Sequence, residues 1–152
     1  MTIRCEIVTQ ERIVYSEDVD SVNLPGIEGR MGILPNHSPL LTVLDFGEVI
    51  TRKAGREEFF AIGGGFAEVQ PEKVIVLADS AEHADEIDIQ RAEQARAQAL
   101  QAMEEGVELD METYALIERS LHRANIRLDV SRRRSKMPRR RQLPDLSGES
   151  SE

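Results

Sequence analysis

The chain has 152 residues, enough for one domain and an appendage, and with 40% hydrophobic residues but no tryptophan its core must be mainly aliphatic. The net charge of −9 hides a basic segment at residues 132–152, and the acidic remainder is unsuited to non-specific nucleic-acid binding. The single cysteine, Cys5, excludes an internal disulfide and a cysteine-based zinc cluster, and we expect a buried thiol. No apolar run approaches the roughly 20 residues of a membrane-spanning helix, and the N-terminus lacks a signal or transit peptide, so we expect a soluble protein.

Residues 1–80 have the pattern of short strands separated by turns. Ile3, Cys5 and Ile7 alternate with charged residues, which is the period of a half-buried strand. Further strand-like segments follow at residues 13–24, 32–35, 40–44, 48–52, 58–62, 66–69 and 74–78. The last is a continuous apolar run, typical of a strand buried on both faces. Turn signals about every 8–12 residues, with no helical pattern between them, predict a β-sandwich or barrel.

From Asp88 onward the periodicity becomes helical. Asp88 is placed to cap a first helix that ends near Gly106, and four alanines recur along one face: Ala92, Ala95, Ala99 and Ala102. A second helix over residues 110–130 carries a stripe of larger apolar residues: Tyr114, Ile117, Leu121, Ala124 and Leu128. The short connection predicts an antiparallel hairpin. An alanine stripe buries little apolar area, so we expect a weakly docked hairpin that can move as a switch.

These patterns divide the chain into three parts. We expect a β-sandwich over residues 1–84, a helical hairpin over 85–130 and an arginine-rich tail over 131–152. The tail has almost no apolar content, so we expect it to be disordered when free.

Sequence features of an enzyme are scarce. The three histidines, His37, His83 and His122, have no metal-ligand spacing, and His37-Ser38 reads as part of a turn rather than as a base and nucleophile. Gly63-Gly64-Gly65 is followed by a strand pattern and by no lysine, so a β-bulge or tight bend explains it better than a phosphate loop. We therefore expect no catalytic residues and no metal site.

The helical region contains a more informative cluster of arginines. Arg119, Arg123 and Arg127 recur every four residues on the second helix, and Arg91 lies at the start of the first. In an antiparallel hairpin Arg91, Arg123 and Arg127 converge, and an anion such as phosphate would relieve their repulsion. Alternatively, Asp88, Glu93 or Asp129 neutralises them on a solvated face. Spacing alone leaves both interpretations open.

Several segments, taken together, resemble the epsilon subunit of the F-type ATP synthase over residues 1 to about 130. They are GILPNHSPLL at residues 32–41, GGFAEV at 64–69, VLAD at 76–79 and IDIQRA at 87–92. The resemblance implies a β-sandwich followed by a two-helix hairpin. It also implies a subunit without catalytic activity of its own, which binds the gamma subunit and the c-ring in the rotating central stalk. Proton-driven ATP synthesis and a peripheral location on the cytoplasmic face of a bacterial plasma membrane follow from the same resemblance.

The resemblance also assigns candidate sites. The partner-facing turn would include Arg30, Met31, Pro35, Asn36, His37 and Ser38. The hairpin would permit turnover when folded on the sandwich and inhibit ATP hydrolysis when extended along gamma, against the catalytic alpha/beta head. ATP would be a regulatory ligand rather than a required cofactor, and its site would comprise Glu82, Ile87, Asp88, Arg91, Ala92, Arg123 and Arg127.

The sequence leaves two questions open, one about the function of the chain and one about its tail. The chain could be a stand-alone β-sandwich binding module whose helices sense a nucleotide or polyphosphate. The tail could be inert, could place its arginines against the catalytic head, or could contact anionic lipid.

Overall fold

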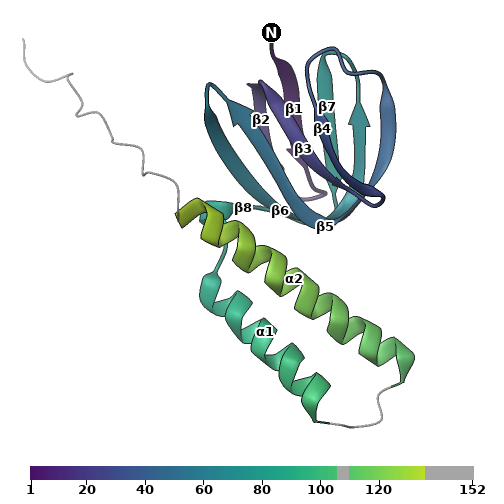
Figure 1. The fold of residues 1–152 in the computed structure, drawn as a ribbon, viewed down its shortest axis with the longest axis vertical. Helices are drawn as coiled ribbons and strands as arrows, with labels where there is room; N and C mark the ends of the chain where they lie inside the picture. Colours follow the sequence, from purple (N-terminus) through teal and green to yellow (C-terminus); the bar gives the residue numbers. More distant parts are fainter. Residues whose placement is uncertain (106–109, 136–152) are drawn as a thin grey trace, which may run out of the picture.

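The computed structural model describes residues 1–105 and 110–135 and shows a β-sandwich followed by two antiparallel helices (Figure 1). The fold class expected from the sequence is confirmed for these residues. The strands are β1 (Ile3–Val8), β2 (Ile13–Val19), β3 (Ser21–Gly26), β4 (Gly29–Ile33), β5 (Leu40–Lys53), β6 (Arg56–Val69), β7 (Lys73–Ala78) and β8 (Ala81–His83). A 3-10 turn, η1 (Ala84–Glu86), leads into α1 (Ile89–Glu104) and α2 (Met111–Ser135).

One continuous sheet folds over itself to make the sandwich. Its strand order is β2-β1-β7-β6-β5-β3-β4, with β8 paired to β6 beside β7. The β1–β7 pair is parallel and the other pairs are antiparallel. The four short strands expected within residues 40–69 are in fact two strands of 14 residues each, β5 and β6. The prediction divided them wrongly because the glycines at 47 and 63–65 bend these strands without ending them.

The triple glycine lies where β6 changes partner from β8 to β7. Gly64 and Gly65 have φ of 91° and 128°, and the β5–β6 register is unchanged across them. The tight bend expected from the sequence is therefore confirmed, and no bulge is present. A strand can turn from one layer of a sandwich to the other at such a bend.

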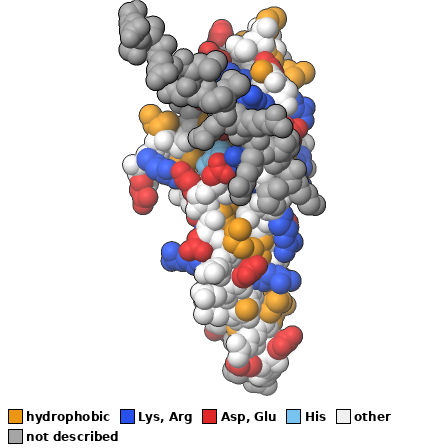
Figure 2. All heavy atoms as spheres, turned by 90° about the vertical axis from the view of Figure 1, so that its left-hand side faces the viewer, with side chains coloured by type: hydrophobic (Ala, Val, Ile, Leu, Met, Phe, Trp, Pro, Cys, Tyr) orange, Lys and Arg blue, Asp and Glu red, His pale blue; other side chains and the backbone are white. Residues whose placement is uncertain are grey.

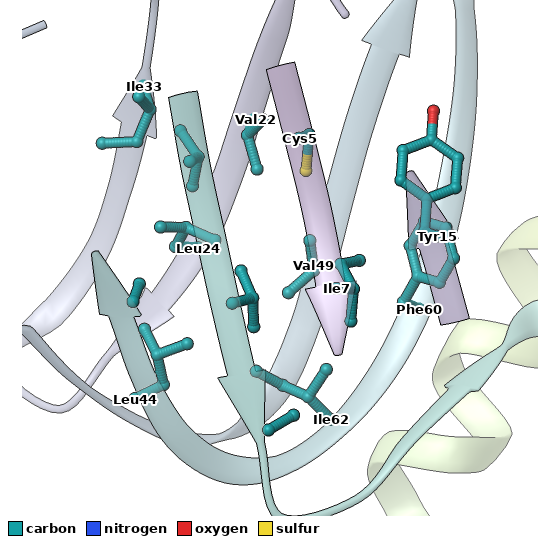
Figure 3. Packing of buried hydrophobic residues seen from close by; sticks show 14 of the residues in the cluster. Cys5, Ile7, Tyr15, Val22, Leu24, Ile33, Leu44, Val49, Phe60 and Ile62 are labelled. Carbon is teal, nitrogen blue, oxygen red and sulfur yellow. The ribbon is translucent and has the colours of Figure 1, made fainter. Parts of the chain in front are cut away.

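The main core lies between the two layers (Figure 3). Ile3, Cys5 and Ile7 all point into it, as their alternation predicted. Phe60 is fully buried, and the ring of Tyr15 meets it edge-on with centroids 5.0 Å apart. Cys5 is fully buried, which confirms the expected buried thiol, and this burial raises the pKa of the thiol to about 12.

The prediction that residues 74–78 are buried on both faces is wrong. Val74 and Val76 enter the core, but Leu77 on the outer face is 51% exposed. The outer face of β5 and β6 is covered instead, because α2 packs on these two strands. This second cluster comprises Ile50, Phe59, Ala61, Ala84, Ile87 and Val130, with Ile126 packed against it.

The hairpin meets the sandwich through α2, which lies between the sheet and α1 (Figure 1). Asp88 caps α1 by accepting a hydrogen bond from the Arg91 backbone N–H at 3.1 Å. The second helix continues to Ser135, so the first five residues assigned to the disordered tail are helical. Packing explains the difference, since Val130 and Ser131 are buried against the sandwich. The rest of the tail, residues 136–152, lies outside the described residues. In the part of the chain described, no helix is both long and apolar enough to cross a membrane.

Candidate functional site

A cavity of about 310 Å³ lies between the sandwich and the helices. Its apolar side is formed by Phe46, Ala61, Ile62 and Ile126, with Gly63 and Ser80 beside them. Its charged side is formed by Glu82 from β8, Arg91 from α1, and Arg123 and Arg127 from α2. The volume is at the lower end of the roughly 300–1,000 Å³ typical of small-molecule sites. Both helices and the sandwich contribute walls, so the cavity exists only while the hairpin is docked.

One of the arginines is already neutralised. Arg127 Nε donates to Glu82 Oε2 and Arg127 Nη2 donates to Glu82 Oε1, both at 3.1 Å. Both side chains are half-buried, and this bidentate geometry is the stronger form of an arginine–carboxylate pair. The pair joins α2 directly to β8.

The other two arginines face the cavity without a carboxylate partner among residues 1–105 and 110–135. The Arg123 guanidinium lies over the Phe46 ring, 5.0 Å from its centroid, in a cation–π contact. The three acids that could have neutralised the cluster do not reach Arg91 or Arg123, since Asp88 caps α1 and Asp129 pairs with Arg132. Glu93 makes no ion pair within the described residues. The cavity is therefore suited to an anion with an apolar portion.

The structure separates the seven candidate ATP-binding residues into two groups. Glu82, Arg91, Arg123 and Arg127 line the cavity. Ile87 and Ala92 are buried packing residues, and Asp88 is the helix cap, so these three hold the start of α1 in place. Sequence reasoning missed Phe46 and Ser80, because only the strand register shows that they reach this cavity.

His83, the last residue of β8, links β6 to η1 and directly follows the cavity residue Glu82 in the chain. Its Nε2 lies 3.3 Å from Glu58 Oε1, and its Nδ1 lies 3.5 Å from Asp85 Oδ2. In the neutral ring Nδ1 also accepts the Asp85 backbone N–H at 3.1 Å. The hydrogen bond with Glu58 raises the pKa of His83 above its ordinary value of 6.5 and lowers that of Glu58. The Asp85 carboxylate raises the pKa of His83 further, and the Arg134 guanidinium lowers it.

Protonated His83 is therefore expected to stabilise the folded chain. Because the folded pKa is the higher one, the contribution is complete below pH 6.5 and is lost as the pH rises through the folded pKa. Urea unfolding of the wild type and of His83→Gln measures it, and the stability difference should shrink from acidic to alkaline pH. An NMR titration of the ring should give a pKa above 6.5 that falls in Glu58→Gln. A ring pKa at or below 6.5 in the wild type would contradict the assignment.

The residues expected to face a partner lie on β4 and on the turn that follows it. Pro35, Asn36, His37 and Ser38 make a turn after β4, which is fixed at one end of the sandwich because the Asn36 N–H donates to Pro71 O at 2.8 Å. Met31 is partly buried against the core, and Arg30, whose side chain is 53% exposed, pairs with Glu48, with Nη2 3.8 Å from Oε1.

An exposed apolar patch on the outer sheet face was missed. Val43, Phe66 and Leu77 are neighbours across β5, β6 and β7 and are 44%, 52% and 51% exposed. Leu41, two residues before Val43, is also exposed. Contiguous exposed apolar side chains of this kind mark interaction surfaces. Residue pattern could not reveal the patch, because its residues lie in apolar runs that are typical of a buried core.

Family models match both parts of the fold. The beta-sandwich domain of the ATP synthase delta/epsilon chain matches residues 2–84, and its long alpha-helix domain matches residues 85–132. A β-sandwich domain followed by a helical domain is the architecture that these two models describe.

Curated relatives give the finer assignment. The ATP synthase epsilon chain of Herpetosiphon aurantiacus is 54% identical over 134 residues, covering 88% of this chain and 97% of that protein. The epsilon chain of Dehalococcoides mccartyi strain BAV1 is 50% identical over 137 residues, covering 90% and 96% respectively. The chain belongs to the ATP synthase epsilon-chain family.

Solved structures agree at the level of the fold. A chain in the Euglena gracilis mitochondrial ATP synthase, a complex described as OSCP/F1/c-ring, superposes with a TM-score of 0.71 at 23% identity. The match covers 82% of this chain and 78% of that one. A chain from the Tetrahymena thermophila mitochondrial ATP synthase, from a structure described as central stalk/c-ring, gives a TM-score of 0.59 at 13% identity, covering 86% and 97%.

Proposed function

We propose that the chain is a non-catalytic subunit of the central stalk of an F-type ATP synthase, and that ATP in the charged cavity holds its hairpin docked. Membership of the epsilon-chain family supports the first part, and so does the structural similarity to a chain from the Tetrahymena thermophila central stalk/c-ring complex. The cavity between hairpin and sandwich carries the second part. The subunit would then be peripheral to the membrane, on its cytoplasmic face in a bacterium, and would support proton-coupled ATP synthesis.

The two sides of the cavity suit the two ends of a nucleotide. Arg91 and Arg123 supply cationic forks for the phosphates, which arginine binds bidentately. Phe46 and Ile126 supply an apolar surface for the base. Because the walls come from separate elements, ATP binds the docked hairpin better than the extended one and shifts the population toward it. A fall in ATP would release the hairpin to contact gamma and the alpha/beta head and inhibit hydrolysis.

Two further surfaces fit the stalk partners. The apolar patch of Val43, Phe66 and Leu77 suits a hydrophobic face of the gamma subunit. The turn at Asn36 and Ser38, at one end of the sandwich, suits the c-ring. Together they would fix the sandwich while the hairpin moves.

Calorimetric titration of ATP into the full chain, with and without magnesium, tests the nucleotide gate. We expect saturable binding that Arg123→Gln weakens about tenfold or more, since a charge-assisted hydrogen bond contributes roughly 1.5–3 kcal/mol. Arg119→Gln is the matched control because it removes the same charge from the same helix outside the cavity. Circular dichroism of both variants would verify that the helices are retained.

The outcomes separate the two parts of the proposal. Equal ATP affinities of the wild type and of Arg123→Gln would show that Arg123 does not bind the nucleotide. The absence of saturable ATP binding would contradict the proposed nucleotide gate. Co-purification with a gamma subunit tests the stalk assignment independently. A folded chain that binds nucleotide but no gamma subunit would favour the stand-alone sensor instead.

A further inference from the structure

The last turns of α2 hold the sandwich through contacts outside the nucleotide cavity. Arg133 Nη1 lies 2.8 Å from Glu48 Oε1 on β5, and Arg134 Nε donates to Asp85 Oδ1 of η1 at 2.6 Å. Neither arginine belongs to the cavity wall. Figure 2 shows basic and acidic side chains interspersed along the hairpin and at its junction with the sandwich.

Glu48 is an unusual partner because it is buried. Its side chain is 6% exposed, and burial raises its pKa while Arg133, and then Arg30, oppose that effect. The contact with Arg133 is an ion pair rather than an aligned hydrogen bond, since Glu48 Oε1 has no hydrogen-bond partner. A buried carboxylate is unfavourable without a nearby cation. If α2 left the sandwich, Glu48 would keep only Arg30, at 3.8 Å.

An apolar contact lies between these ion pairs and the rest of the helix. Val130 is fully buried against Ile50 and Phe59, and Ser131 beside it is also buried. The docked end of α2 therefore combines a small buried apolar contact with two ion pairs. The carboxylates of these ion pairs belong to two separate elements, β5 and η1.

We propose that Arg133 and Arg134 form an electrostatic latch that closes on Glu48 and Asp85 and adds to the stability of the docked hairpin whether or not nucleotide is bound. The latch is independent of the proposed ATP site, because it shares no residue with the cavity. Glu48 also pairs with Arg30 on β4, so the same carboxylate connects the latch to an edge strand of the sandwich. The basic residues at the start of the tail thus act on their own chain.

The latch can be measured through the reactivity of a cysteine placed under α2. Ala84 on η1 is 5% exposed and packs in the cluster that α2 covers, so Ala84→Cys should react with a thiol reagent only when the hairpin opens. We expect no labelling of Cys5, because it is buried in the sandwich core. In this background and without nucleotide, we expect Arg133→Gln with Arg134→Gln to raise the labelling rate about tenfold or more. Arg119→Gln is the control and should leave the rate unchanged.

A double-mutant cycle identifies the partner. Arg133→Gln strands a buried carboxylate, whereas Glu48→Gln combined with Arg133→Gln removes both charges. We expect the pair of changes to open the hairpin no more than Arg133→Gln alone. We also expect raised salt to accelerate labelling less in the pair than in the wild type, because only the Arg134–Asp85 contact remains to be screened. Additive effects of the two substitutions, or a labelling rate that neither arginine variant changes, would overturn the latch. Both results are obtained without ATP, so they stand whether or not the nucleotide gate exists.

Discussion

Replacing Gly65 with alanine is expected to lower the free energy of unfolding of the sandwich by about 3 kcal/mol or more. Gly65 has a φ of 128°, which side chains rarely adopt, and an added Cβ would lie 2.1 Å from Leu77 O. That oxygen belongs to backbone, and Gly65 and Ala78 are paired in the ladder, so neither strand can move away without losing pairing. Urea unfolding, followed by far-ultraviolet circular dichroism, measures the loss.

Gly55→Ala provides the control for backbone strain. Gly55 has a φ of 76°, but an added Cβ would meet nothing within 4 Å. Its replacement should therefore cost only the conformational strain, about 1 kcal/mol. Equal losses in the two variants would show that the close approach of β6 and β7 is not what requires glycine at position 65.

Phe66→Glu is expected to weaken assembly with the gamma subunit about a hundredfold or more. Phe66 is the middle residue of the exposed patch, between Val43 and Leu77, and aromatic residues at the centre of interfaces carry much of the binding free energy. A carboxylate there would have to be desolvated without a partner. Because the side chain is 52% exposed in the free chain, the fold should tolerate the change.

Assembly can be followed by co-purification and by titration with reconstituted gamma and c-ring. Ile13→Glu is the matched control, since Ile13 is 68% exposed on β2, away from the patch. Retained assembly of Phe66→Glu, or an equal loss in Ile13→Glu, would place the gamma contact elsewhere on the sandwich.

Local pattern predicted the fold class and most of the elements, although it divided β5 and β6 into four strands. The alternation of Ile3, Cys5 and Ile7 identified a half-buried strand, and Asp88 marked the start of α1. Local pattern could not show which element, if any, covers the outer face of each strand. Ile50 and Leu77 look equivalent in the sequence, yet α2 buries the first and leaves the second open.

The candidate site was predictable only in part, for a related reason. Helical spacing brought Arg91, Arg123 and Arg127 together, and all three line the cavity. Spacing could not show that Glu82 would neutralise Arg127 alone, nor that Phe46 would lie beneath Arg123. Those contacts depend on how the hairpin is placed on the sandwich. The same limit applies to Glu48, whose partner Arg133 lies 85 positions away along the chain.

The short link between β8 and α1 has a consequence for the strength of docking. Only residues 84–88 separate the sandwich from α1, and α2 is carried with α1 as its packing partner. The outer face of β5 and β6 and the helix α2 that docks on it are thus tethered. Each experiences the other at an effective concentration of the order of millimolar. Contacts far too weak to join two separate proteins suffice to keep this helix in place. For the same reason, losing a single charged contact can change the balance of states severalfold while every domain stays folded.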